Sequence, residues 1–270
     1  MTSRHGLYAY GLVGELPGPL ALAGIDQQQG IYAIEEKGLR VLVSHIDVDA
    51  FQSQVKHAFA EFTSAAGAVQ QGTAALLQAH EDVVDALMQQ TTVVPFKFGT
   101  LLKDEAAASR MLLDDEERFK QLLARFAGKA EWGLKVYADT GALIQHIASI
   151  EPGIAELHAQ REKLAPGAAY LLGKKLEQAV KDAVAARLAS ITEAIFQQAD
   201  EDASEAKLSK TLPRKLTGKQ QEMILNAAYL VEKASAAHFC QQGKRLQERY
   251  ASLGLELEIS GPWPPYNFTS

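Results

Sequence analysis

Apolar stretches alternate along the chain with turn residues, and their spacing predicts both strands and helices. Leu7–Val13 is apolar and aromatic, and glycines and prolines follow it, which is typical of a buried strand that runs into a loop. Ile31–Ile34 and Leu39–Val43 flank a short turn that contains Gly38, so they predict a β-hairpin. A helix is predicted to begin near Ala50, after a capping aspartate.

The next segments complete a first predicted domain. Residues 73–90 carry apolar side chains three and four positions apart, as one face of a helix does. Residues 91–98 are β-branched and aromatic, and this strand is expected to lie at a sheet edge or to be irregular at Pro95, because proline cannot donate to a ladder. A second helix is predicted over about 104–127, with acidic residues at its start. We therefore expect an α+β domain over residues 1–128.

Residues 129–270 predict a second domain with its own sheet. Four strands are predicted, over residues 129–137, 203–209, 223–231 and 255–260. Helices are predicted before the second strand and over 235–253, which gives the βαββαβ order of a ferredoxin-like sheet. The helical residues from about 140 to 200 would be an extension inserted between the first two strands. The fold class expected for the chain is α+β with two domains, the second a modified ferredoxin-like fold with an inserted long helical hairpin.

The longest helical signal covers residues 168–199. Its apolar side chains recur every three or four positions and form one stripe, made by Leu172, Leu176, Val180, Val184, Leu188, Ile191 and Ile195. The expected partner of this stripe is the helix over 153–164, in an antiparallel hairpin. A coiled-coil dimer is less favoured because the register drifts from a strict heptad.

Composition narrows the class of protein. The net charge is −6, whereas a protein that grips nucleic acid through phosphates usually presents a basic surface. Cys240 is the only cysteine, so no internal disulfide or thiolate cluster can form. No apolar run is long enough to span a bilayer, and the first residues lack the apolar core of a signal peptide. We expect a soluble protein in a reducing compartment inside the cell.

Two histidines invite a catalytic or metal-binding interpretation, and neither is well supported. His80-Glu81 begins like a zinc-protease motif, but the position of the second histidine holds Val84. A partly buried helical histidine is the better interpretation. Cys240 follows His238 by two residues, an offset that points the two side chains to different faces of a helix. A buried, inert thiol is therefore favoured over a nucleophile–base pair.

Other candidate sites are also weak. Gly11, Gly14 and Gly18 follow a strand, but prolines stand where a phosphate cradle needs the start of a helix. The acidic run Asp114–Glu117 would fan around a helix and not converge on one cation. The chain is thus predicted to be no enzyme, with no catalytic, cofactor-binding or metal-binding residues.

The segment 207–219 is the best nucleic-acid candidate, because it contains five lysine or arginine residues. It lacks interleaved aromatic side chains on which bases could stack. A solvated or partner-facing loop is favoured over RNA binding.

Several separate segments resemble a known family. Val94-Pro-Phe-Lys-Phe-Gly-Thr100, preceded by His80-Glu-Asp-Val-Val84, resembles the "PFRFGT" region of the gas vesicle GvpF/GvpL family, with Lys97 in place of the arginine. Further similar segments occur in the family's order along the chain. They are Leu7-Tyr-Ala-Tyr-Gly11, Lys129-Ala-Glu-Trp-Gly-Leu-Lys-Val136, Pro166-Gly-Ala-Ala-Tyr-Leu171, Asn226-Ala-Ala-Tyr-Leu-Val231 and Gly261-Pro-Trp-Pro-Pro-Tyr-Asn-Phe268.

The ending also has a structural interpretation. Its three prolines remove hydrogen-bond donors, so the segment is expected to leave the sheet after residue 260. Trp263 and Tyr266 would then clamp the tail onto a neighbouring surface, and a structural clamp is favoured over partner docking.

The resemblance implies a gas vesicle accessory protein without a known catalytic site. Such proteins are minor components or assembly factors of the vesicle, found at its gas-facing side and associated with the small shell protein GvpA. The resemblance also implies two α+β domains, the second of them modified ferredoxin-like. It implies no cofactor, no nucleic-acid partner and no membrane partner, with GvpA and other gas vesicle proteins as the partners.

The partner-binding residues are not identified by the sequence. A sheet edge or the face of the 168–199 helix is our hypothesis for the surface that binds shell subunits. Two other functions stay open. One is a ligand-sensing regulatory protein with a ferredoxin-like domain, and the other is an RNA-binding module that uses the basic segment.

Overall fold

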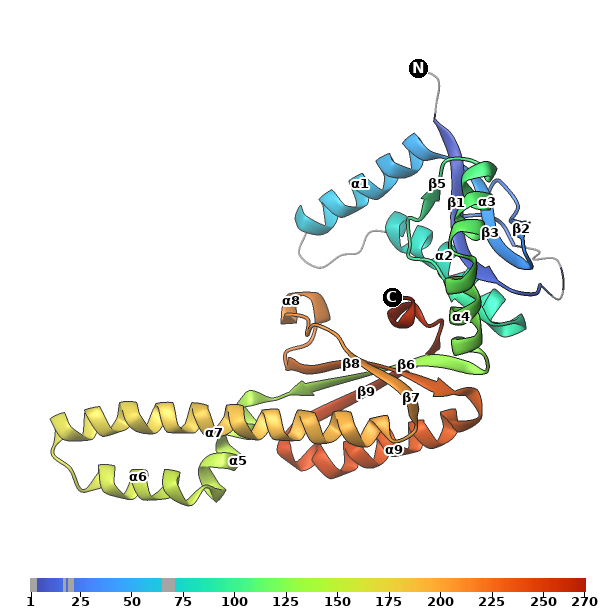
Figure 1. Ribbon diagram of the computed structural model, residues 1–270. Coiled ribbons are helices and arrows are strands. Elements are labelled where there is room, and N and C mark those ends of the chain that lie inside the picture. Colours follow the sequence, from blue (N-terminus) through green and yellow to red (C-terminus); the bar gives the residue numbers. More distant parts are fainter. Residues whose placement is uncertain (1–3, 17, 19–21, 65–70) are drawn as a thin grey trace. The chain divides into compact units, whose positions relative to one another are not determined.

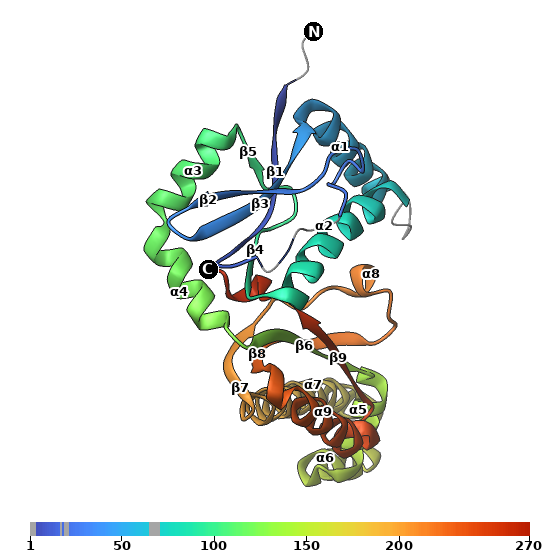
Figure 2. The same ribbon diagram turned by 90° about the vertical axis from the view of Figure 1, so that its right-hand side faces the viewer.

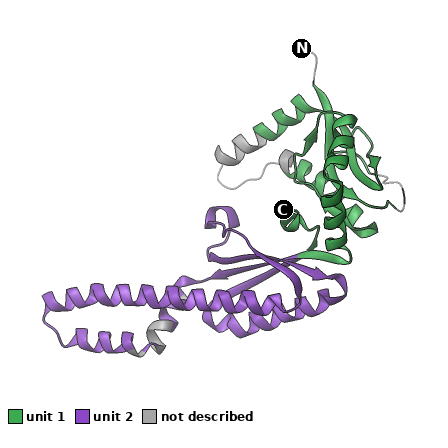
Figure 3. Cartoon of the chain, in the orientation of Figure 1, with its two compact units in different colours: residues 1–131, 261–270 green, residues 132–260 purple. Residues whose placement is uncertain are grey.

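The computed structural model describes residues 4–16, 18, 22–64 and 71–270. The chain forms two compact units, which Figure 3 distinguishes by colour. Unit 1 comprises residues 1–131 and 261–270, and unit 2 comprises residues 132–260. The chain therefore leaves unit 1 and returns to it at its end. The predicted second domain, residues 129–270, includes ten C-terminal residues that the structure groups with unit 1.

Unit 1 contains a five-stranded sheet. Its strands are β1 (His5–Val13), β2 (Tyr32–Glu36), β3 (Leu39–Asp47), β4 (Val93–Pro95) and β5 (Leu101–Leu102). The order is β2-β3-β1-β4, with β5 also paired to β1, and β1 is antiparallel to all three of its neighbours. The residues of β1 from Gly6 to Val13 are all buried, so both faces of this strand are covered. A methyl group on Gly11 would lie 3.0 Å from the carbonyl oxygen of Val94, so this glycine permits close approach of β4.

The helices of unit 1 pack around this sheet. They are α1 (Val48–Ser64), α2 (Gln71–Gln90), α3 (Glu105–Asp114) and α4 (Glu116–Phe126). Val83, Val84 and Leu87 of α2 are buried against the aromatic side chains of β1. Most of the apolar face predicted for this helix thus lies in the core, whereas Leu77 is 45% exposed.

The predicted helix over 104–127 is two helices. Asp104 caps α3 as expected, since its Oδ1 accepts a hydrogen bond from the backbone N–H of Ala107 at 2.8 Å. The chain then leaves helical geometry at Asp115, where φ is −106° and ψ is 18°. The acidic run therefore lies across a helix junction, where Glu116 pairs with Lys120 at 2.5 Å and Asp115 faces Arg118 at 3.9 Å. These acidic side chains therefore form ion pairs with basic residues three and four positions away in the same helix.

Unit 2 is built on a four-stranded sheet with the order β7-β8-β6-β9. The strands are β6 (Lys129–Ala138), β7 (Ala203–Leu208), β8 (Glu222–Glu232) and β9 (Leu255–Trp263). Helices α7 (Pro166–Asp200) and α9 (Ala236–Tyr250) lie side by side on one face of this sheet, as Figures 1 and 2 show. β9 continues to Trp263, so the expectation that the chain leaves the sheet after residue 260 is wrong. The strand tolerates Pro262 because it is an edge strand.

The helical extension of unit 2 contains α5 (Thr140–Ile150), α6 (Pro152–Glu162) and the first half of α7. A short turn joins α6 to α7, and the two helices run alongside each other (Figure 1). Leu176 and Val184 of α7 pack with Leu143 and Ile154, whereas Ile191 and residues after it join the core beneath the sheet. The apolar stripe of this helix is therefore packed mainly against other residues of unit 2.

Four short helical elements complete the chain: α8 (Arg214–Thr217) and the 3-10 turns Lys233–Ser235, Ala251–Leu253 and Tyr266–Phe268. Across the described residues, no helix has both the length and the apolar character needed to cross a membrane.

Candidate functional site

Four of the segments that carry the family resemblance meet in unit 1. They are the opening strand, the start of the His80 segment, the 94–100 segment and the C-terminal tail, and they are joined by hydrogen bonds through Tyr8, His80, Phe96 and Tyr266. These segments are far apart in the sequence. Their convergence makes this cluster the first place to look for chemistry.

His80 is fully buried and both of its ring nitrogens have partners. Its Nε2 donates to the carbonyl oxygen of Phe96 at 3.1 Å, because a carbonyl can only accept. Nδ1 therefore accepts the hydroxyl proton of Tyr8 at 2.9 Å. Burial lowers the pKa of His80 from its ordinary 6.5 to about 4, so the imidazole is neutral near pH 7.

Tyr8 extends this network to the turn after β4. Its hydroxyl oxygen accepts the backbone N–H of Gly99 at 3.0 Å. Gly99 has a φ of +83°, a conformation that favours glycine, and the turn is closed by hydrogen bonds from Thr100 to the carbonyl oxygen of Lys97. The glycine and threonine of the resembling segment thus shape a turn. Lys97, in contrast, is exposed.

Replacing Tyr8 by phenylalanine is expected to lower the free energy of unfolding of unit 1 by about 1–3 kcal/mol. The change leaves His80 Nδ1 and the Gly99 N–H without their partner in a buried site. Urea denaturation, with amide hydrogen exchange of β1 reporting on unit 1, measures the loss. Tyr32→Phe is the control, since the Tyr32 hydroxyl bonds Glu105 in a more exposed setting. Equal losses for both variants would contradict the buried network.

The C-terminal tail is fixed by a buried carboxylate. Glu131 accepts hydrogen bonds from the backbone N–H and the side-chain amide of Asn267, at 2.8 and 2.5 Å. The Tyr266 hydroxyl donates to Glu81 at 3.2 Å, and burial raises the pKa of both Glu81 and Tyr266. Phe268 is fully buried. The tail therefore serves as a clamp, as the structural interpretation proposed.

The members of the clamp differ from those expected. Tyr266 points inward as predicted, but Trp263 is 44% exposed and contributes little to the clamp. Glu131, Asn267 and Phe268 were not singled out by the sequence. The signal for Glu131 would have been an acidic residue inside an otherwise apolar strand.

Both ring nitrogens of His80 are engaged within the protein, one with the Tyr8 hydroxyl and the other with the Phe96 carbonyl oxygen. Among the described residues, no group of three or more histidine, cysteine or acidic side chains is arranged to hold a metal ion.

Cys240 and His238 do not meet either. His238 Nδ1 lies 2.8 Å from Asp202 Oδ2, on the exposed side of α9. Cys240 is a free thiol that is half-buried and packs against the core of unit 2, so it is less enclosed than predicted. Of the three glycines, Gly11 lies within β1 and Gly14 directly after it, and Pro17 and Pro19 fall outside the described residues.

Unit 2 carries several large apolar side chains that are exposed to solvent. At the tip of the helical extension, Tyr170 and Leu171 are 65% and 67% exposed, and Leu164 in the turn is also exposed. Tyr170 and Leu171 end the resembling segment that begins at Pro166. These two residues precede the buried stripe of α7, and their apolar side chains are accessible to a partner.

The sequence of residues 6–270 matches the profile of the family described as gas vesicle synthesis protein GvpL/GvpF. Gas vesicle protein L of Streptomyces sp. (strain CB03234) is 29% identical over 191 residues, which cover 71% of this chain and 67% of the relative. Gas vesicle protein F of Microcystis aeruginosa (strain PCC 7806) is 23% identical over 275 residues, or 97% of each chain.

The fold has counterparts among solved structures. The crystal structure of GvpF from Anabaena sp. PCC7120 superposes with a TM-score of 0.75 at 21% identity, covering 100% of this chain and 99% of that one. GvpF from Microcystis aeruginosa gives a TM-score of 0.68 at 22% identity, covering 98% and 99%. Two sheets accompanied by helices, as the predicted α+β class requires, are thus a shared architecture. Together with the match over nearly the whole sequence, this places the chain in the gas vesicle GvpL/GvpF family.

Proposed function

We propose that this protein is a gas vesicle accessory protein, a minor component or assembly factor that binds the small shell protein GvpA at the gas-facing side of the vesicle. The work it does is adhesion and not catalysis. A shell that excludes water must present an apolar face, and free subunits would aggregate through it. A partner that covers this face until assembly would prevent that loss. The vesicle, inside the cell, is the proposed location.

The exposed tip of the helical extension is the observation that supports this proposal. Tyr170 and Leu171 are large apolar side chains near the start of α7, and they do not contribute to the core of unit 2. The buried stripe of α7 is unavailable to a partner, so the binding surface we assign to this helix is its N-terminal end. An aromatic and an aliphatic side chain held on a rigid helix suit contact with an apolar shell subunit.

We also propose that the two units are the two domains and that unit 2 is a modified ferredoxin-like domain with an inserted helical extension. The order β7-β8-β6-β9, with α7 and α9 on one face, supports this description.

The double variant Tyr170→Glu with Leu171→Glu is expected to reduce co-purification of GvpA at least tenfold. Two carboxylates at the tip would have to be desolvated against an apolar surface. The measurement is the amount of GvpA retained by the tagged full-length chain, together with flotation of cells that carry the variant. Lys175→Glu is the matched control, because it changes the charge by the same amount at an exposed position of the same helix.

Retention of GvpA by the double variant would remove the tip from the proposal. Normal flotation of cells that lack the gene, combined with a wild-type chain that retains no GvpA, would refute the function itself.

A further inference from the structure

The segment between β7 and β8 has an unusual composition for this chain. Residues 207–219 contain five lysine or arginine residues and no acidic residue, whereas the whole protein carries a net charge of −6. The segment lies entirely within unit 2. Neither the adhesion proposed for the helical tip nor the core of unit 2 accounts for this charge.

The segment is held in a defined shape at its first half. The backbone N–H of Ser209 donates to the carbonyl oxygen of Asn226 at 2.8 Å, and the Asn226 amide donates to the carbonyl oxygen of Lys210 at 2.9 Å. Further on, the N–H of Leu212 approaches the sulfur of Met223 at 3.3 Å. The loop is therefore fastened along the beginning of β8.

Its second half is held by one lysine. Lys219 Nζ lies 2.6 Å from Glu256 and 2.5 Å from Glu258 on β9, and 4.4 Å from the centre of the Tyr137 ring. With both ends fastened, the stretch between them is ordered before any partner arrives. Such pre-organisation lowers the entropy lost on binding.

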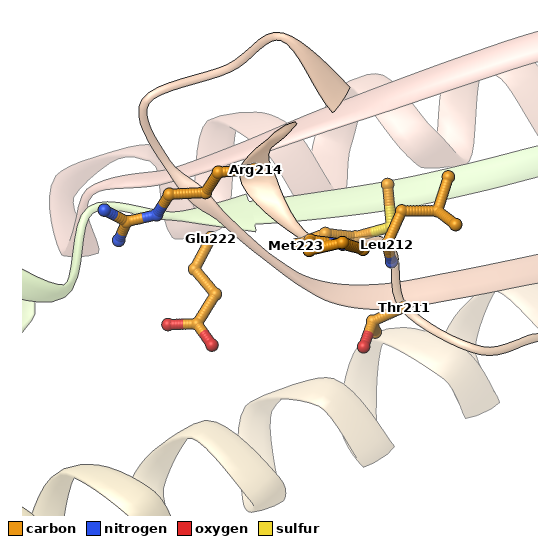
Figure 4. Close-up of a pocket in the computed structure, with 6 residues that line it drawn as sticks. Thr211, Leu212, Arg214, Glu222 and Met223 are labelled. Carbon is orange, nitrogen blue, oxygen red and sulfur yellow. The ribbon is translucent and has the colours of Figure 1, made fainter. Parts of the chain in front are cut away.

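Between these anchors the segment presents leucines to solvent. Leu208, Leu212 and Leu216 follow one another at intervals of four residues and are 62%, 39% and 52% exposed. Leu212 and Met223 line one end of a hollow, and Arg214 and Glu222 extend at the other, as Figure 4 shows. A second hollow, which shares Thr211 with the first, continues past Leu208 toward Phe196 of α7. Together they form a groove lined by apolar side chains, among them Leu208, Leu212 and Met223, and by polar and charged ones.

The segment itself carries only positive charge. Lys210, Arg214 and Lys215 are exposed, and within the described part of the chain none of them forms an ion pair. Arg214 and Glu222 line the first hollow and Glu193 lines the second, whereas Lys210 and Lys215 lie next to the hollows in the same segment. A partner that matches this groove needs an apolar stripe flanked by acidic side chains.

We propose that this surface, formed by residues 208–216 with the start of β8, binds an acidic amphipathic helix of a partner protein. A helix can lay a stripe of apolar side chains into such a groove while its flanking carboxylates pair with the three cations. RNA fits less well, because residues 207–219 contain no aromatic side chain on which a base could stack. This site is separate from the helical tip and does not depend on the function proposed for it.

Fluorescence anisotropy with the full-length chain tests the proposal. The probes are three labelled 18-residue peptides and a 20-nucleotide oligouridine. One peptide has a leucine stripe flanked by glutamate, the second has lysine in place of glutamate, and the third is a scramble of the first. The acidic helix is expected to bind at least tenfold more tightly than the other three probes, with an affinity that falls as salt is added.

Variants locate the binding. Leu212→Ser and Arg214→Glu are each expected to weaken binding of the acidic helix at least fivefold. Leu113→Ser and Lys175→Glu are controls, since they make the same changes at exposed positions elsewhere. Unchanged near-ultraviolet circular dichroism shows that each variant is folded.

The proposal is overturned by three results. These are no binding of the acidic helix at 100 µM, equal binding of the scramble, or tighter binding of oligouridine that Arg214→Glu abolishes. The last of these would assign the surface to nucleic acid.

Discussion

Replacing Phe268 by alanine is expected to lower the free energy of unfolding of unit 1 by about 3–5 kcal/mol. Phe268 is fully buried, so the change removes a large apolar side chain and leaves a cavity that the surroundings fill only in part. The backbone carbonyl oxygen of residue 268, which accepts a hydrogen bond from Arg125 at 3.1 Å, is retained in the variant, so the loss reports on the side chain. Hydrogen exchange of the β1 amides in increasing urea measures the change.

The same C-terminal segment supplies the control. Trp263→Ala removes a larger aromatic side chain, but that side chain is 44% exposed, and its loss should cost less than half as much as the loss of Phe268. If the tryptophan variant is the less stable of the two, Trp263 and not Phe268 is the main anchor of the C-terminal tail.

Acid is expected to destabilise unit 1 through His80. The pKa of this histidine is about 4 in the folded protein and 6.5 when it is exposed to water. Between these values the unfolded chain binds a proton that the folded chain does not, so stability falls as the pH drops from 6.5 to 4. A difference of this size corresponds to about 3 kcal/mol. Above pH 6.5 the histidine makes no pH-dependent contribution.

His80→Gln isolates this effect. The amide can still donate toward the Phe96 carbonyl but does not titrate, so the variant should be less stable at pH 7 and should lose less stability than the wild type between pH 6.5 and 4. Urea denaturation at several pH values compares the two proteins. Parallel pH profiles would mean that His80 does not cause the acid sensitivity.

Elements with a clear period could be predicted from the sequence. The strand at the start, the hairpin of β2 and β3 and the long helix over 168–199 appear nearly where their patterns place them. The break at Asp115 could not be predicted in the same way. Ala108 and Leu112 of α3 and Phe119 and Leu122 of α4 keep helical spacing across the junction, so the stripe looks continuous although the backbone is not.

Contacts between residues far apart in the chain also could not be predicted from the sequence. The hydrogen bond between Glu131 and Asn267 joins residues 136 positions apart, and no local pattern reports it. The apolar stripe over 168–199 was visible, but periodicity cannot tell whether such a stripe meets a partner or the protein's own core. Leu143 and Ile154 cover part of it, which moved the proposed contact to Tyr170 and Leu171.

The two-part composition of unit 1 has a consequence for how the protein is made. Its first 131 residues leave the ribosome long before residues 261–270, which supply Phe268 and Tyr266. Until residues 261–270 have been synthesised, the site that receives these aromatic rings stays unfilled, and the nascent protein presents apolar surface to chaperones. Synthesis that stops early therefore yields a product with a defective first unit even though that unit's long N-terminal part is intact. The folding of unit 1 therefore has to wait for the synthesis of residues 261–270.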